Sequence, residues 1–181
     1  PGGRRDVARV RHVGDRGLRV LSAPPPLRSI REASHRFIGM TNTEHAPRPT
    51  HTVVNPDGLH DPIPFGYSHT AVVPAGAELV LVSGQYGSRP DGAVVSPDFT
   101  DQVDQTFRNI ATALAAHGLD LGHVVQLRTY VVNHDVSKLG PIAAAVQANW
   151  GTTPPTQTLI GVASLATPDV LFEVEALAAR P

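Results

Sequence analysis

The stretch between residues 98 and 117 most constrains how this chain can fold. Its apolar residues recur at spacings of four, three and four, at Val103, Phe107, Ile110 and Leu114. Such spacing puts them on one face of an α-helix. Asp98 or Ser96 can cap the start of this helix, and Gly118 can end it. The pattern therefore predicts an amphipathic helix whose apolar face packs against another layer.

Strand-like segments lie on both sides of this helix. Residues 67–73 and 78–83 are joined by a short turn at 74–77, which predicts an antiparallel hairpin. A second helix is expected to be capped by Ser137 and to end at Gly151. The remaining strand candidates are residues 124–132, 157–162 and 170–178. The order β-β-α-β-α-β-β predicts an α/β (α+β) domain, with a mixed sheet and two helices packed on one face.

The second face of this sheet is too apolar to meet water. Val80, Leu81 and Val82 follow one another, so they occupy both faces of their strand. Two helices on one side leave the other side of a sheet uncovered, and a large exposed apolar patch usually marks an interface. We therefore expect other subunits to cover the second face.

Residues 1–39 differ in charge from the rest of the chain. They hold nine arginines, no lysine and three acidic residues, a formal charge of +6, whereas residues 40–181 carry a charge of −7. One interpretation is upstream sequence read through in frame, with the natural protein starting at Met40. A disordered Arg-rich arm, or a transit peptide, is the alternative. Residues 40–64, rich in Pro, His, Asn and Asp, are expected to form an extended leader, and residues 65–181 the folded domain.

Several classes of site are disfavoured by what the sequence lacks. The absence of cysteine excludes disulfides, a thiolate nucleophile and a Cys-based zinc site, and it fits a cytoplasmic protein. Its nine histidines show no HxH or HExxH spacing, so no metal is predicted, and loop histidines such as His45, His51 and His60 are expected to be solvated. No glycine-rich phosphate loop occurs, and no cofactor is predicted.

Two classes of macromolecular partner are also disfavoured. No apolar run approaches the roughly 20 residues that a membrane helix needs, so no membrane partner is predicted. The negative charge of residues 40–181 argues against nucleic acid as the main partner of the domain, because nucleic-acid affinity depends on neutralising phosphates. A small molecule is therefore the expected ligand.

The last strand carries the most distinctive polar residues. Alternation along residues 170–178 places Glu173 and Glu175 together on one face. The strand at 124–132 presents Arg128 on a single face, between Gln126 and Tyr130, so an ion pair between Arg128 and a glutamate is expected. Two interpretations stay open. The carboxylates form a structural ion-pair cluster at an interface, or one of them has a raised pKa in a partly dry cleft and acts as a general acid or base.

Five segments resemble those of one protein family, in the same order along the chain. They are residues 64–69 (PFGYSH), 83–85 (SGQ), 105–110 (QTFRNI), 124–125 (VV) and 172–176 (FEVEA). Together they span about 115 residues and resemble the RidA/YjgF family, whose members hydrolyse reactive enamines and imines. The resemblance implies a chorismate-mutase-like fold assembled as a homotrimer, with three clefts between subunits.

The resemblance also implies roles for particular residues. Glu173 stands where the family has the carboxylate that orients or activates the attacking water, and Tyr67 and Gly84 stand at cleft-lining positions. Deaminating members hold the substrate carboxylate with an arginine, and the aligned position here is Gln157. A neutral amide cannot make the charge-assisted, bidentate contact of a guanidinium. Altered substrate specificity is therefore expected, with Arg128 as another source of positive charge.

Two main functions follow from these residues. The first is an enamine/imine deaminase of altered specificity, a hydrolase that converts reactive C=N intermediates into carbonyl compounds and ammonia. The alternative is a non-catalytic trimer that binds a small metabolite or has a regulatory role. A third function, nucleic-acid binding, would depend on the arginines of residues 1–39.

Overall fold

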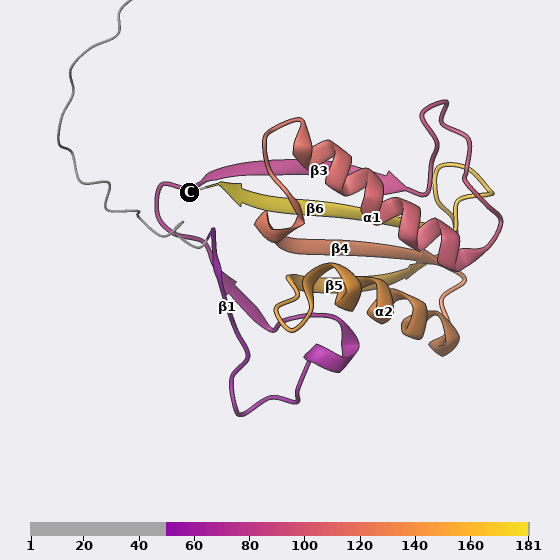
Figure 1. Ribbon diagram of the computed structural model, residues 1–181. Helices are drawn as coiled ribbons and strands as arrows, with labels where there is room; N and C mark the ends of the chain where they lie inside the picture. Colours follow the sequence, from indigo (N-terminus) through magenta and orange to yellow (C-terminus); the bar gives the residue numbers. More distant parts are fainter. Residues whose placement is uncertain (1–49, 181) are drawn as a thin grey trace, which may run out of the picture. The chain divides into compact units, whose positions relative to one another are not determined.

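A mixed four-stranded sheet forms the centre of the structure. The computed structural model describes residues 50–180, so the predictions for residues 1–39 and for the first part of the leader lie outside the described residues. The strands follow the spatial order β3-β6-β4-β5 (Figure 1). They are β3 (Glu78–Tyr86), β4 (Val124–Val132), β5 (Thr156–Val162) and β6 (Phe172–Arg180). β6 is antiparallel to both of its neighbours, whereas β4 and β5 are parallel.

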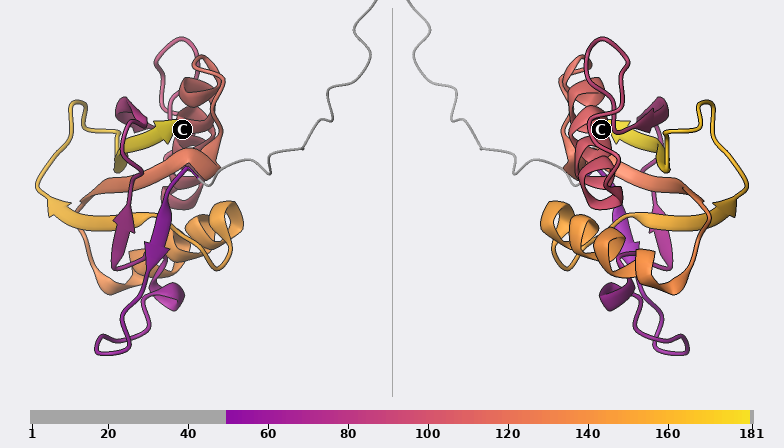
Figure 2. Two further views of the ribbon diagram at one scale, coloured as in Figure 1. Left: turned by 90° about the vertical axis from the view of Figure 1, so that its left-hand side faces the viewer. Right: turned by 90° about the vertical axis from the view of Figure 1, so that its right-hand side faces the viewer.

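Two helices, α1 (Phe99–Ala115) and α2 (Leu139–Trp150), cover one face of this sheet (Figure 1, Figure 2). The predicted fold class, a mixed sheet with two helices on one face, is therefore confirmed. The carboxylate of Asp98 caps α1 as expected, because it accepts hydrogen bonds from the backbone N–H groups of Thr100 and Asp101. Neither helix within residues 50–180 has the length and apolarity that crossing a membrane requires.

The start of α2 differs from the prediction. Ser137 does not cap this helix but lies in the 3-10 turn (Val136–Lys138) that precedes it. Asp135 caps that turn instead, because its carboxylate accepts hydrogen bonds from the backbone N–H and the hydroxyl of Ser137. The local pattern located a capping residue two positions too late, and α2 begins at Leu139.

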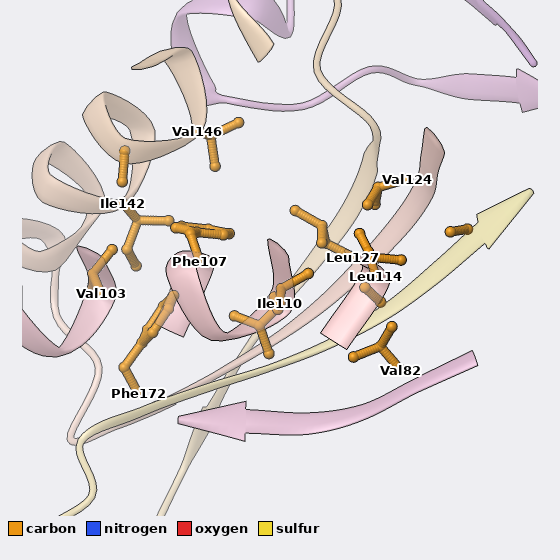
Figure 3. Close-up of a cluster of buried hydrophobic side chains, with 14 of the residues drawn as sticks. Val82, Val103, Phe107, Ile110, Leu114, Val124, Leu127, Ile142, Val146 and Phe172 are labelled. Carbon is orange, nitrogen blue, oxygen red and sulfur yellow. The ribbon is translucent and has the colours of Figure 1, made fainter. Parts of the chain in front are cut away.

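The apolar face of α1 forms the core, with Phe107 near its centre (Figure 3). The four residues that predicted this face are each 2% exposed or less, namely Val103, Phe107, Ile110 and Leu114. The ring of Phe107 meets Trp150 of α2 edge-on, with centroids 5.5 Å apart, and lies 6.1 Å from the ring of Phe172 on β6. One aromatic side chain thus joins both helices to the sheet.

The predicted hairpin between residues 67–73 and 78–83 is wrong. Its turn forms, since the backbone N–H of Ala77 donates to the carbonyl of Pro74 at 3.2 Å, but the flanking strands do not pair. Instead β2 (Thr70–Val72) pairs with β1 (Thr52–Val54), a strand that the sequence pattern did not predict. A bridge between Ser68 and Thr156 holds this segment beside β5, at the sheet edge opposite β3.

The face of the sheet away from the helices is open in the single chain. Val80 and Val82 of β3 are buried toward the helices. Their neighbours along the strand, Leu79 and Leu81, are 51% and 79% exposed. Ile160 on β5 is also exposed, although it too is a large apolar residue. The expected apolar second face is therefore present on the described part of the chain, and Glu173 and Glu175 project from the same side of β6.

Candidate functional site

Glu175 is the carboxylate of the ion pair that the sequence predicted. Its Oε2 lies 3.0 Å from Nη1 of Arg128, and its Oε1 accepts a hydrogen bond of 3.1 Å from the hydroxyl of Tyr130. Arg128 and Glu175 are register partners on β4 and β6, so the pairing follows directly from the strand alignment. Both side chains are about half exposed, and the pair contributes little to stability. Its main effect is to hold these two groups together on the open face.

Glu173 has a different environment from Glu175, although only two residues separate them. Within residues 50–180, no basic side chain forms an ion pair with Glu173. Partial burial, and in second place the negative charge of Glu175, raises the pKa of the Glu173 carboxyl. A carboxylate that has no cationic partner and a raised pKa is available to take up a proton from a ligand or from water.

Gly84 creates the space that Glu173 occupies. A Cβ atom built on Gly84 would lie 2.0 Å from Oε1 of Glu173, far inside contact distance. The pairing of β3 with β6 shifts register between Val82 and Gln85, so Gly84 sits in an irregular stretch of the strand. The absence of a side chain at this position therefore lets the carboxylate lie against the backbone of β3.

Tyr67 and Gln157 line a separate groove of about 420 Å³ beside β5. Gly66 positions the tyrosine: it has φ of +80°, and a Cβ there would crowd Ala143 and Val146 of α2 at 3.3 Å. On the other side of Tyr67, the buried hydroxyl of Ser68 donates to the carbonyl of Pro154 at 2.6 Å. Tyr67 is thus held between two anchored residues.

Gln157 lines this groove and carries a buried acceptor without a donor among the described residues. Its register partner on β4 is Leu127, which is fully buried against the helices, so Gln157 faces the helix side of the sheet and not the face of Glu173. Its Oε1 is buried and accepts no hydrogen bond from any described residue. Buried polar atoms in folded proteins nearly always have a partner, so this unpaired acceptor marks Gln157 as a candidate site residue.

His60 contacts Tyr67 of this groove, and it is exposed, as expected for a loop histidine. Its Nε2 lies 2.6 Å from the hydroxyl oxygen of Tyr67, and its ring packs edge-on against those of Phe65 and His69. His69 also lines the groove of Tyr67 and Gln157. Periodicity cannot detect such a contact, because His60 and Tyr67 lie in an irregular loop. The only local signal is the density of aromatic and histidine residues over positions 60–69.

The single chain brings the predicted site residues together in two groups and not in one. Gly84 and Glu173 lie where β3 meets β6, whereas Tyr67 and Gln157 lie beside β5, and β4 stands between β6 and β5. Arg128 on β4 points to neither group, because it is paired with Glu175 in a smaller groove on the open face. In the described range 50–180, no three His, Asp or Glu side chains are arranged to hold a metal ion.

Comparisons with known proteins agree on the kind of domain. Residues 62–180 match the sequence model of a family described as Endoribonuclease L-PSP. The RutC family protein YjgH of Escherichia coli (strain K12) is 31% identical over 131 residues, which cover 72% of this chain and 95% of YjgH. This similarity therefore extends over nearly the whole of the relative.

Solved structures show the same fold. The Rid family protein YyfB from Yersinia pestis, a protein of unknown function, has 34% sequence identity and a TM-score of 0.69, covering 72% of this chain and 99% of YyfB. TdcF of Escherichia coli, solved with bound serine, has 27% identity and a TM-score of 0.51 and covers 60% of this chain and 85% of TdcF.

Proposed function

Because this chain belongs to the Rid/YjgF family, we propose that it is an enamine/imine deaminase, a hydrolase that converts reactive C=N compounds into carbonyl compounds and ammonia. The observation that carries this proposal is the state of Glu173, a partly buried carboxylate with a raised pKa and no cationic partner in residues 50–180. A carboxylate that served only in a structural ion pair would resemble Glu175, which is bonded to Arg128 and Tyr130.

The reaction needs a base for water and an acid for the departing nitrogen. The carboxylate of Glu173 takes a proton from water while the water oxygen bonds to the carbon of the protonated C=N group, whose π electrons move onto the nitrogen. The resulting carbinolamine carries hydroxyl and amino groups on one carbon. Glu173 then releases its proton to solvent and takes the hydroxyl proton while the nitrogen is protonated, so that the C–N bond breaks and ammonia and the carbonyl product are released. Tyr67 lies at the groove and has a phenolic O–H to donate to this nitrogen.

The clefts of a trimer would unite the two groups of residues that lie apart in one chain. We place Tyr67 and Gln157 of one subunit against Gly84 and Glu173 of the next. Two features support this assembly: the exposed Leu79 and Leu81 on the open face of the sheet, and the oligomeric habit of the family. Arg128 and Glu175 lie on that same face and would be enclosed by it.

Mixed oligomers test this arrangement. Tyr67→Phe and Glu173→Gln chains, each of low activity alone, are expected to give about a quarter of the wild-type activity when coexpressed in equal amounts, because random assembly restores both residues in that share of clefts. The control pairs wild type with the Tyr67→Phe/Glu173→Gln double variant. If the site lies within one chain, the first mixture stays inactive while the control keeps about half of the wild-type activity.

Gln157 indicates a substrate whose polar group is neutral. An amide holds a carboxylate less tightly than a guanidinium does, because it lacks charge assistance and the bidentate fork. Its buried Oε1 has no donor among the described residues, so this position favours a substrate group that donates a hydrogen bond, such as an amide or a hydroxyl. Small α-imino acids are therefore expected to be poorer substrates than C=N compounds with a neutral side group.

Gln157→Arg is expected to reverse this preference. A guanidinium in the groove of Tyr67 would supply the missing charged partner, which is worth about 2–5 kcal/mol, or roughly two to three decades in kcat/KM for 2-iminopropanoate. Gln157→Met is the matched control, since it keeps the length of the side chain and cannot hydrogen-bond an anion. Equal kcat/KM values for the arginine and methionine variants would show that this position does not select the substrate.

The function itself is tested by a panel of freshly generated C=N substrates. The panel contains 2-iminopropanoate, 2-iminobutanoate and aminomuconate-type compounds, and ammonia release is measured with wild type and Glu173→Gln. Absence of hydrolysis above buffer on every member would overturn the proposal. RNA is included because of the name of the matching family, although residues 62–180 carry five basic and ten acidic residues, a charge that disfavours binding to phosphates.

A second candidate is a non-catalytic trimer that binds a small metabolite. It is favoured by Gln157, which departs from the arginine of deaminating members, and by the serine bound to the related TdcF. Mass spectrometry of the purified protein distinguishes the two: an unmodified ligand that remains bound to an inactive trimer favours the binding function.

A further inference from the structure

His60 and Tyr67 form a short hydrogen bond beside the groove next to β5. The His60 Nε2 atom lies 2.6 Å from the Tyr67 hydroxyl oxygen, and the two rings meet edge-on. Tyr67 lines the groove, whereas His60 is exposed on the loop behind it. The pair therefore connects the groove to solvent through two groups that each carry an exchangeable proton.

His69 and Asn55 keep His60 in place. The ring Nε2 of His69 lies 2.8 Å from the carbonyl oxygen of His60. A carbonyl only accepts, so His69 donates through this nitrogen. The backbone N–H of His69 donates in turn to Oδ1 of Asn55 at 2.8 Å. The orientation of His60 toward Tyr67 is thus fixed by a network and not by one contact.

We propose that His60 is a positioning residue that acts through Tyr67 by renewing the proton which the tyrosine donates to the leaving nitrogen. This inference rests on the proposed deaminase function. Tyr67 O–H gives its proton to the carbinolamine nitrogen while the protonated ring of His60 gives its Nε2 proton to the Tyr67 oxygen. Glu173 takes the hydroxyl proton as the C–N bond breaks, ammonia leaves, and His60 is left neutral. Solvent reprotonates it, because its ring is exposed.

The protonation of His60 Nε2 decides which way the hydrogen bond points. A neutral ring with its proton on Nδ1 accepts the Tyr67 proton and withholds it from the groove, whereas a fully protonated ring donates to the Tyr67 oxygen and leaves the phenolic proton free. The titratable groups that contact His60 are Tyr67 and His69, and Phe65, which also packs on the ring, is uncharged. The adjacent Asp61 accepts a hydrogen bond from its own turn, at the backbone N–H of Ile63.

Two substitutions separate proton transfer from simple support of the tyrosine. His60→Gln keeps a hydrogen-bonding side chain beside the Tyr67 hydroxyl but does not titrate, whereas His60→Leu keeps neither property. Full pH profiles of kcat and KM are measured for both, with His117→Gln as the control, because His117 is an exposed histidine just after α1 and lines no part of this groove. Circular dichroism and thermal unfolding confirm that each variant is folded.

The wild-type pH profile of kcat is expected to contain a limb that depends on protonation of a histidine. His60→Gln should lack that limb. On the acid side of the profile its kcat should be about ten- to a hundredfold below that of wild type, and its KM should stay within about threefold of the wild-type value. His60→Leu should also raise KM, because Tyr67 loses its hydrogen-bond partner.

Each outcome bears on the proposal. If the profile of His60→Gln coincides with that of wild type while Glu173→Gln is inactive, the deaminase function stands and the role of His60 is overturned. If His60→Gln and His60→Leu lose activity equally at every pH, His60 supports Tyr67 structurally and transfers no proton. If wild type hydrolyses nothing in the panel, the proposed function fails and this inference fails with it.

Discussion

Glu173→Gln is expected to lower kcat/KM for C=N hydrolysis by about two to four decades without weakening the fold. Removal of a general base from a positioned site has an effect of this size. Gln has nearly the shape of Glu, so the packing against Gly84 is preserved while the proton acceptor is lost. Ammonia release under saturating and limiting substrate gives kcat and KM separately, and a loss carried mainly by kcat is the expected pattern.

Two further variants make this measurement specific. Glu175→Gln changes the neighbouring carboxylate, which is bonded to Arg128 and Tyr130, and should reduce kcat/KM far less. Gly84→Ala keeps Glu173 but pushes its carboxylate aside, because the new Cβ would lie 2.0 Å from Oε1. A loss of about ten- to a hundredfold is expected from such a displacement. Equal losses in the Glu173 and Glu175 variants would contradict the assignment of the base.

The raised pKa of Glu173 gives this prediction a pH dependence. The base must be ionised, so the acid limb of the wild-type profile should lie at higher pH than an unperturbed glutamate would give. The stability of the folded protein depends on pH in the opposite direction to the activity. A carboxyl whose pKa is higher in the folded than in the unfolded protein binds more protons when folded, so stability falls as pH rises through the interval between the two values. At pH 7 the Glu173→Gln protein should therefore be at least as stable as wild type.

The largest effect on stability is expected from Phe107→Ala. This side chain is 2% exposed and joins α1 to Trp150 and Phe172, so its removal leaves a cavity that the surrounding helices and sheet cannot fill by small shifts. Such truncations cost about 3–5 kcal/mol, a large part of the stability of a typical domain. The midpoint of thermal unfolding should fall by about 10–20 °C.

Phe65→Ala is the matched control for this measurement. It removes the same atoms from a side chain that is 60% exposed, so its effect on the unfolding free energy should stay below about 1 kcal/mol. Unfolding is compared at one protein concentration, because assembly of the chain would make the apparent stability depend on concentration. Similar losses for both variants would mean that Phe107 is not a centre of the core.

Much of the architecture was predictable because it depends on local periodicity. The four apolar positions of α1 identified its buried face, and the alternation along β6 identified the side of the sheet from which both glutamates project. Predictions that needed a strand partner were less successful. The turn before β3 was correct, but the hairpin was wrong, because Ser68 is held beside β5 by contacts more than eighty residues away in sequence.

Part of the candidate site, too, could be predicted from the sequence and part could not. The sequence alone determined that two carboxylates and Arg128 share one face of a sheet, because side-chain direction in a strand follows from parity. Only the tertiary structure decided that Glu175 is the paired carboxylate and Glu173 the one with the raised pKa, since pairing depends on which residues of β4 and β3 lie opposite β6. It likewise decided that His60 contacts Tyr67, a contact made in an irregular loop where no sequence period applies.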